Sequence, residues 1–228
     1  MKDYMVLIDI DGTLIHTGGA GMRALDRALE AEYGLKNAFA GYSFAGKTDQ
    51  RILKDGFTRW LNRLPEPQDY ERCQTAYLRF LDEELTAAPD QYVILPGVVE
   101  LLERLRDLGI PTGLATGNLK AGARRKLEVG NLWKYFPFGG FGSDAEHRGE
   151  LTLRGIERGR TWAGRHIPAP NVLVVGDSPL DIEAAHYAGA RSLAVLTGWT
   201  ESAKLSSSEF LMDDLSDTEA VMQAVFSH

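Results

Sequence analysis

Short aliphatic runs alternate with helical stretches along most of this chain. Residues 4–8 form an unbroken apolar run rich in branched side chains, which predicts a buried strand. Similar runs predict strands at residues 111–115, 171–175 and 191–196. Apolar positions at helical spacing predict helices at residues 98–108, 119–129, 151–162, 182–188 and 218–226. Strands that are apolar on both faces and alternate with helices favour an α/β fold, a doubly wound parallel sheet covered on both sides.

The segment between the first strand and residue 90 follows a different pattern. It shows helical periodicity at residues 22–33, 49–61 and 70–85, with no convincing strand between them. We therefore predict a helical cap domain at residues 16–89, inserted into a core formed by residues 1–15 and 90–228. The glycine-rich residues 18–21 are a candidate hinge. The acidic residues 209–219 are expected to be solvated surface.

Composition narrows the range of partners. The 228 residues carry a formal net charge of -7 and include one cysteine, Cys73. A nucleic-acid binder would need a basic face, so no nucleic-acid partner is expected. A single cysteine permits no intrachain disulfide and fits a reducing compartment. The apolar run at residues 4–8 is too short for a signal or a membrane span. These features predict a cytoplasmic protein without a membrane partner.

Two carboxylates follow the first strand. Asp9 and Asp11 are two positions apart, so their side chains should leave the strand on the same side, and Gly12 then permits a sharp turn. Two anions held close together repel, and either one is protonated or a cation joins them. A buried strand does not need this arrangement for stability, so the pair indicates a chemical role for these two carboxylates.

Other polar residues follow later strands of the predicted sheet. Thr116 and its neighbours follow residues 111–115, and Asp177 follows residues 171–175. Ligands of doubly wound sheets bind at the carboxyl ends of the strands, so these groups should meet at one edge. Asp9, Asp11 and Asp177 would form an oxygen-ligand site suited to Mg2+. An aspartate beside Mg2+ could attack phosphorus, and its neighbour could transfer protons.

Three motifs in this order, DIDGTL, LATGN and VVGDSPLDI, each at a strand end, resemble those of the haloacid dehalogenase superfamily of aspartyl phosphatases. The helical insert resembles the C1 cap of that family, on a Rossmann-like core, and the chain is similar to phosphoglycolate phosphatases. The resemblance implies that Asp9 is the nucleophile and a Mg2+ ligand. It implies that Asp11 is the general acid/base and binds Mg2+ through its backbone carbonyl. Dehalogenases of the family lack a carboxylate at the position of Asp11, so phosphate chemistry is favoured.

The same resemblance assigns the remaining site residues. Asp177 would be the third protein ligand of Mg2+. Asp181 would lie beside the ligands without binding the metal directly. The phosphoryl group would be bound by a set of hydroxyl and backbone groups from Gly12, Thr116, Gly117 and Asn118.

The family also has a lysine that pairs with the nucleophile and the phosphate, about 30 residues before the GD pair. This chain has no lysine between Lys134 and Lys204. Arg148 stands at the matching place and is our candidate for this role, with Arg154 as the second candidate. Arginine keeps a permanent charge, but its planar guanidinium has a different hydrogen-bond geometry.

Several of these residues also fit simpler structural roles. Thr116 and Asn118 are suited to cap the helix that follows them. The residues 178–181, Ser-Pro-Leu-Asp, have the pattern of a capped helix start, which gives Asp181 an alternative role. Four residues of the cap fit either substrate selection or the start of a helix: Lys47, Thr48, Asp49 and Arg51.

We therefore predict a Mg2+-dependent phosphatase that acts on a small phosphorylated metabolite such as phosphoglycolate. One alternative is a sugar-phosphate mutase of the same superfamily, although such mutases place a cap histidine near Gly21 and none is found there. The other is a non-enzymatic phosphoacceptor or phosphate-sensing module, which would share the acidic pocket but not the helical insert.

Overall fold

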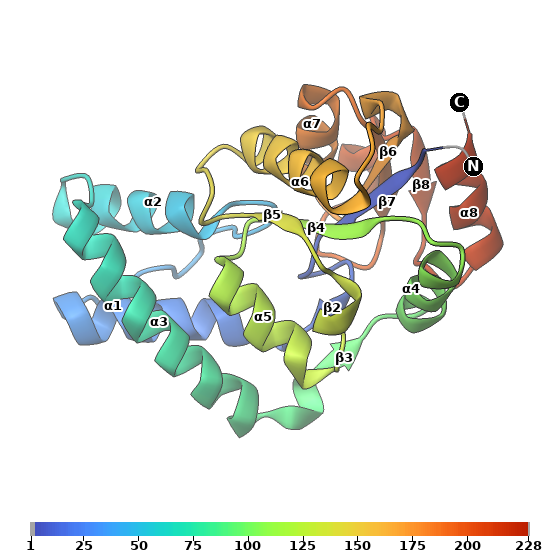
Figure 1. Cartoon of the computed structure of the whole chain (residues 1–228). Helices are drawn as coiled ribbons and strands as arrows, with labels where there is room; N and C mark the ends of the chain where they lie inside the picture. Colours follow the sequence, from blue (N-terminus) through green and yellow to red (C-terminus); the bar gives the residue numbers. More distant parts are fainter. Residues whose placement is uncertain (1–2, 228) are drawn as a thin grey trace.

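The computed structural model describes residues 3–227 and contains a six-stranded sheet (Figure 1). The strand order is β5-β4-β1-β6-β7-β8, and all neighbouring strands are parallel. The strands are β1 (Met5–Ile8), β4 (Thr112–Thr116), β5 (Gly139–Phe141), β6 (Val172–Gly176), β7 (Arg191–Val195) and β8 (Phe210–Met212). β1 lies inside the sheet, since its four aliphatic residues are buried on both faces. The predicted doubly wound α/β fold is confirmed.

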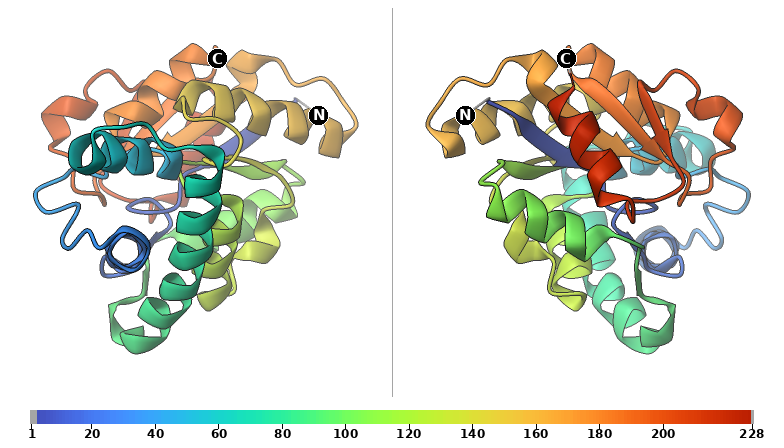
Figure 2. Two further views of the ribbon diagram at one scale, coloured as in Figure 1. Left: turned by 90° about the vertical axis from the view of Figure 1, so that its left-hand side faces the viewer. Right: turned by 90° about the vertical axis from the view of Figure 1, so that its right-hand side faces the viewer.

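Helices cover both faces of this sheet. Side chains alternate along a strand, so Val6 and Ile8 of β1 pack against α4, α5 and α8, whereas Met5 and Leu7 pack against α6 and α7. Figure 1 shows α6 above the sheet and α4 and α5 below it, and the right-hand view of Figure 2 shows α8 in front of it. The helices are α4 (Val98–Asp107), α5 (Lys120–Val129), α6 (Arg148–Ala163), α7 (Pro179–Tyr187) and α8 (Thr218–Phe226). Single-turn 3₁₀ helices are η1 (Pro89–Gln91), η2 (Trp133–Tyr135), η3 (Ala169–Asn171) and η4 (Ser202–Leu205).

Two strands of the sheet are absent from the sequence-based prediction. β5 begins with two glycines, which lack the branched side chains that mark a strand in sequence. β8 lies within the acidic residues 209–219, which were expected to be solvated surface. That expectation is wrong in part, because Phe210 and Met212 of β8 are only partly exposed and Leu215 is buried.

The three helices of the insert pack on one another. They are α1 (Ala20–Tyr33), α2 (Asp49–Leu61) and α3 (Pro67–Ala87), and we call the segment from α1 to α3 the cap. Its apolar cluster includes Leu29, Phe57 and Tyr77. The chain leaves the core through β2 (Ile15–His16) and returns through β3 (Val93–Ile94), and these two short strands pair antiparallel. Gly18 and Gly19 precede α1 with positive φ angles, a conformation that favours glycine.

The single cysteine of the chain belongs to the core of the cap. Cys73 of α3 is buried and carries a free thiol. Within residues 3–227, no helix is both long and apolar enough to span a bilayer. The cytoplasmic location stays a prediction.

Candidate active site

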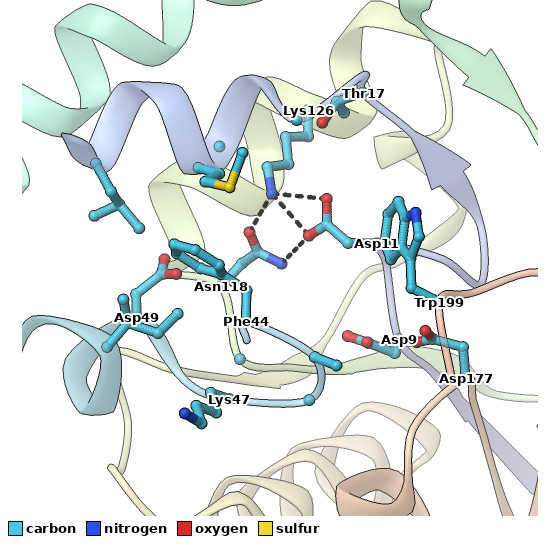
Figure 3. Close-up of a pocket in the computed structure, with 18 of the residues that line it drawn as sticks. Asp9, Asp11, Thr17, Phe44, Lys47, Asp49, Asn118, Lys126, Asp177 and Trp199 are labelled. Carbon is cyan, nitrogen blue, oxygen red and sulfur yellow. Dashed lines mark hydrogen bonds and ion pairs between the residues drawn. The ribbon is translucent and has the colours of Figure 1, made fainter. Parts of the chain in front are cut away.

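Three neighbouring strands end beside the cap. β1, β4 and β6 deliver Asp9, Thr116 and Asp177 to the same edge of the sheet, as the spacing of the motifs predicts. A cavity of about 150 Å³ lies between this edge and the cap. Its charged and polar walls include Asp9, Asp11, Lys47, Asp49, Asn118, Lys126, Arg148 and Asp177, several of which are shown in Figure 3.

Asp9 is buried next to a guanidinium group. Nη2 of Arg148 lies 3.0 Å from Oδ2 of Asp9. Burial raises the pKa of Asp9 to about 6, although the charge of Arg148 opposes the rise; the charges of Asp181 and Asp11 add to it. Two opposing effects therefore act on Asp9: the charge of Arg148 favours its ionised form, and burial disfavours that form.

The carboxylate of Asp177 faces Asp9 and receives no hydrogen bond from a described residue. One oxygen each of Asp9, Asp177 and Asp181 lie within 4.8 Å of one another. Burial, with the charges of Asp181 and Asp9, raises the pKa of Asp177 to about 8. Among the described residues, no hydrogen bond reaches the Asp177 carboxylate, so its oxygens are available to a ligand. A Cβ at Gly198 would lie 1.8 Å from Oδ2 of Asp177, so any side chain at this position would clash with the carboxylate.

These carboxylates fit Mg2+. Hard oxygen donors in a compact group are its preferred ligands, and burial, with repulsion from neighbouring carboxylates, raises the pKa values of Asp9 and Asp177, a cost that a cation would offset. Asp181 has other partners, because it accepts hydrogen bonds from the backbone and hydroxyl of Ser178 and pairs with Arg148. The capping interpretation of Asp181 is confirmed, and the oxygens of Asp9 and Asp177 are left for the cation.

Arg148 is the first residue of α6 and is buried in the site. Besides Asp9 and Asp181, it donates through Nη1 to the backbone oxygen of Gly46 at 2.8 Å. Burial disfavours its charge, but Asp181 and Asp9 outweigh this effect and raise its pKa above the usual value. The second candidate, Arg154, is exposed and pairs with Glu157. The structure therefore brings Arg148, and not Arg154, to the predicted nucleophile.

The side chain of Asp11 turns away from this cluster and toward Lys126 (Figure 3). Nζ of Lys126 lies 2.8 Å from Oδ1 and 2.7 Å from Oδ2 of Asp11, and Nδ2 of Asn118 donates to the same Oδ2 at 2.8 Å. Lys126 also donates to Oδ1 of Asn118 at 2.7 Å. Lys126 is not among the site residues predicted from the sequence. The only available signal was its place on the apolar face of α5, three residues after the buried Ala123.

Thr116 and Asn118 do not cap the following helix. The hydroxyl of Thr116 accepts hydrogen bonds from the backbone and side-chain nitrogens of Asn118. At the start of α5 the backbone N–H of Leu119 instead donates to Oδ2 of Asp49 at 2.8 Å, and that of Lys120 donates to the hydroxyl of Ser143 at 3.4 Å. The capping interpretation of Thr116 and Asn118 is thus wrong, because their side chains bind each other and other residues accept the N–H groups at the start of α5.

The loop before α2 lies directly on the core. The backbone N–H of Asp49 donates to the backbone oxygen of Gly117 at 2.8 Å. A Cβ at Gly117 would lie 2.2 Å from the backbone oxygen of Lys47, so the two chains approach closely. Asp49 is half-buried, and desolvation raises its pKa to about 6 although Lys126 opposes the rise. The cap therefore closes over the strand ends in this structure.

The four candidate cap residues separate into two groups. Thr48 accepts a hydrogen bond from the backbone of Arg51 and starts α2, as the helix-start interpretation predicts. Arg51 pairs with Asp55 and lies outside the cavity walls, whereas Lys47 and Asp49 line them. Only the latter two can meet a bound compound.

Known proteins share both the motifs and the fold. A family model described as haloacid dehalogenase-like hydrolase matches residues 5–189. A protein named "Putative pyrophosphatase PpaX" from Caldanaerobacter subterraneus subsp. tengcongensis is 31% identical over 204 residues, covering 86% of this chain and 82% of that protein. A phosphoglycolate phosphatase from Nitrosospira multiformis is 28% identical over 200 residues, covering 86% and 84%.

The structure of a β-phosphoglucomutase from Clostridium difficile matches with a TM-score of 0.73 at 18% identity, covering 99% of this chain and 97% of that one. This likeness shows a shared fold. Together with the family model and the relatives, it confirms the predicted resemblance. The chain belongs to the haloacid dehalogenase-like hydrolase family.

Proposed function

We propose that this protein is a Mg2+-dependent phosphatase that hydrolyses a small phosphomonoester through an aspartyl-phosphate on Asp9. One observation carries the proposal: two carboxylates share a cavity but have different partners. Asp9 lies against Arg148, whereas Asp11 is held by Lys126 and Asn118. Carboxylates in different surroundings can take different roles in one reaction.

In the first step Asp9 attacks phosphorus. A bond forms between a carboxylate oxygen and phosphorus, and the bond to the leaving oxygen breaks and leaves its electron pair there. Arg148 neutralises charge on the phosphoryl oxygens, and Asp11 supplies the proton to the leaving oxygen. In the second step Asp11 takes a proton from water, whose oxygen bonds to phosphorus. The bond between phosphorus and the Asp9 oxygen breaks with its electron pair on that oxygen, which restores the Asp9 carboxylate and releases inorganic phosphate.

The phosphoryl oxygens would be received by the strand-end turns. The candidate groups there are the Thr116 hydroxyl, the backbone N–H of Gly117 and the turn at Gly12. The backbone N–H of Asn118 donates to the Thr116 hydroxyl in this structure and would have to turn from it to the phosphoryl group. Mg2+ would be held by Asp9, Asp177 and the backbone carbonyl of Asp11, and it would neutralise charge on the phosphoryl group.

The cavity supports a small substrate. Its volume of about 150 Å³ is below the roughly 300–1,000 Å³ of common ligand pockets, which favours a small compound. Relatives named phosphoglycolate phosphatase and pyrophosphatase make phosphoglycolate and pyrophosphate the first compounds to test. A mutase is not favoured, since none of the histidines described by the structure lines the cavity.

Phosphate release with Mg2+ from phosphoglycolate, pyrophosphate and p-nitrophenyl phosphate tests this function. Asp9→Asn should abolish release, because an amide oxygen is a poor nucleophile. Asp107→Asn is the matched control, since Asp107 is exposed and pairs only with its neighbour Arg106 among the described residues. Undiminished turnover by Asp9→Asn would sink the assignment. A long-lived phosphorylated Asp9 without turnover would favour a sensing module, and sugar-phosphate isomerisation without phosphate release would favour a mutase.

A further inference from the structure

The buried Lys126 of the core binds Asp11, the proposed proton-transfer residue. Lys126 lies on α5, and its side chain is 5% exposed. Its three acceptors lie at 2.7–2.8 Å: both carboxylate oxygens of Asp11 and Oδ1 of Asn118. An ammonium group has three N–H donors, so none is left for a substrate. Lys126 therefore acts on Asp11 and not on the substrate directly.

The contacts hold the Asp11 carboxylate as an acceptor. Both of its oxygens accept from the same ammonium group, and Oδ2 accepts a further hydrogen bond from Asn118. This geometry fits a carboxylate, which is an acceptor only. The carboxylate is also the form that can take a proton from water.

The cap leaves space for this lysine. A Cβ at Gly21 of α1 would lie 3.0 Å from Nζ and 3.3 Å from Cε of Lys126. A side chain at this position would crowd the end of Lys126, and glycine avoids that contact. The side chain of Lys126 thus extends from α5 of the core to α1 of the cap, and both helices restrict its position.

We propose that Lys126 is a positioning residue that holds the Asp11 carboxylate in place as the base for hydrolysis of the aspartyl-phosphate. This inference rests on the proposed function, because it concerns the second step at the same site. Lys126 restricts the Asp11 carboxylate to one orientation, and a misplacement of about 1 Å can cost a reaction up to 10²-fold. The first step with a good leaving group needs no proton, so it should be nearly independent of Lys126.

The test is steady-state and burst kinetics with p-nitrophenyl phosphate and Mg2+. For this substrate, kcat/KM reports the formation of the aspartyl-phosphate, and kcat includes its hydrolysis. Lys126→Met should lower kcat by about 10–100-fold and change kcat/KM by less than about threefold, so KM falls too. A burst of nitrophenolate and radiolabelled phosphate trapped on Asp9 should accompany the change.

Three further variants make the result specific. Lys126→Arg keeps the charge and should recover part of kcat. Lys120→Met removes an exposed lysine from the same helix and should behave as the wild type. In an Asp11→Asn background, Lys126→Met should cause no further loss, because its effect passes through the Asp11 carboxylate. Thermal melting establishes that each variant is folded.

Two results would overturn the inference. Equal losses in kcat and kcat/KM would show a general structural role, and an additional loss in the Asp11→Asn background would show an effect that bypasses Asp11. If the wild type released no nitrophenolate, or Asp9→Asn stayed active, the proposed phosphatase function would fail instead. The two failures are therefore distinguishable.

Discussion

Arg148 joins Asp9 to the cap. Its Nη2 lies 3.0 Å from Oδ2 of Asp9, and its Nη1 donates to the backbone oxygen of Gly46 at 2.8 Å. The same guanidinium pairs with Asp181 at the start of α7. A lysine has one nitrogen and could not reach these partners in the same planar geometry. One side chain thus connects the cap loop to the surroundings of Asp9.

Replacement of Arg148 by lysine should separate charge from geometry. Arg148→Lys keeps a cation beside Asp9 but loses the hydrogen bond to Gly46, so we expect kcat/KM to fall by about tenfold. Arg148→Met removes both and should lower kcat/KM by about 10²–10³-fold, the range seen when a charge-stabilising donor is lost. The measurement is Mg2+-dependent hydrolysis of p-nitrophenyl phosphate. Arg154→Met, at an exposed position, is the control. Full activity of Arg148→Lys would contradict a role for the contact with the cap.

The seating of the cap loop can be tested at Gly46. Gly46 has a φ of +68°, and a Cβ there would lie 2.3 Å from the Ser178 hydroxyl and 2.8 Å from Cβ of Leu180. Gly46→Ala should therefore hold the loop away from the core, lower kcat/KM by at least about tenfold and expose the cap to limited proteolysis.

Gly41 provides a matched control for that experiment. It has a similar φ of +70°, but a Cβ there would meet no atom within 4 Å. Gly41→Ala should cost only the left-handed backbone strain, about 1–2 kcal/mol, without a change in kcat/KM. Equal losses of activity in both variants would show that strain, and not contact with Ser178, is responsible.

The acidic cluster predicts a pH dependence of stability that Mg2+ should reverse. The pKa of Asp177 is raised to about 8 in the metal-free folded protein, against an ordinary value of 3.8. The folded state therefore binds more protons than the unfolded state between these values, and stability falls as pH rises through this range. Mg2+ competes with the protons, so it should raise Tm more at pH 8.5 than at pH 6. Thermal melting with and without Mg2+ measures this, and Asp177→Asn should remove most of the difference. A larger Mg2+ effect at pH 6 would contradict the assignment.

The sequence predicts the parts of the site that lie at the ends of regular strands. Asp9, Thr116 and Asp177 each follow an apolar run, and parallel strands end at a common edge, so their convergence follows from periodicity alone. Arg148 could be proposed only because the family resemblance leaves a place for a cation. The strands β5 and β8 are missed by the prediction. Two of the three residues of β5 are glycines, and β8 lies next to acidic residues.

Lys126 and Gly46 escape prediction for a different reason. Their roles depend on how the cap meets the core, and that orientation is set by contacts between residues far apart in the chain. Lys126 and Asp11 are 115 positions apart, and Arg148 and Gly46 are 102 apart. No local periodicity reports such a pair.

The stability of the cap offers a last prediction, at a distance from the cavity. Asp69 near the start of α3 is 4% exposed and accepts hydrogen bonds from Arg63, the hydroxyl of Tyr33 and the backbone of Glu66. The bond from Arg63 is the largest effect on its pKa, which lies well below the usual value despite opposing desolvation. A depressed pKa gives stability that is present above the ordinary value near 4 and is lost as pH falls.

Asp69→Asn should therefore lower the free energy of unfolding at pH 7 by roughly 1.5–3 kcal/mol, the range for hydrogen bonds to a charged group. The difference from the wild type should shrink below pH 4, because the Asp69 carboxylate of the unfolded chain takes up a proton there while that of the folded protein stays ionised. Urea unfolding at pH 7 and at pH 3 measures both values. Glu71→Gln, an exposed neutralisation on the same helix, should change neither. A loss that stayed the same at both pH values would mean that the shape of the side chain, and not its charge, stabilises the start of α3.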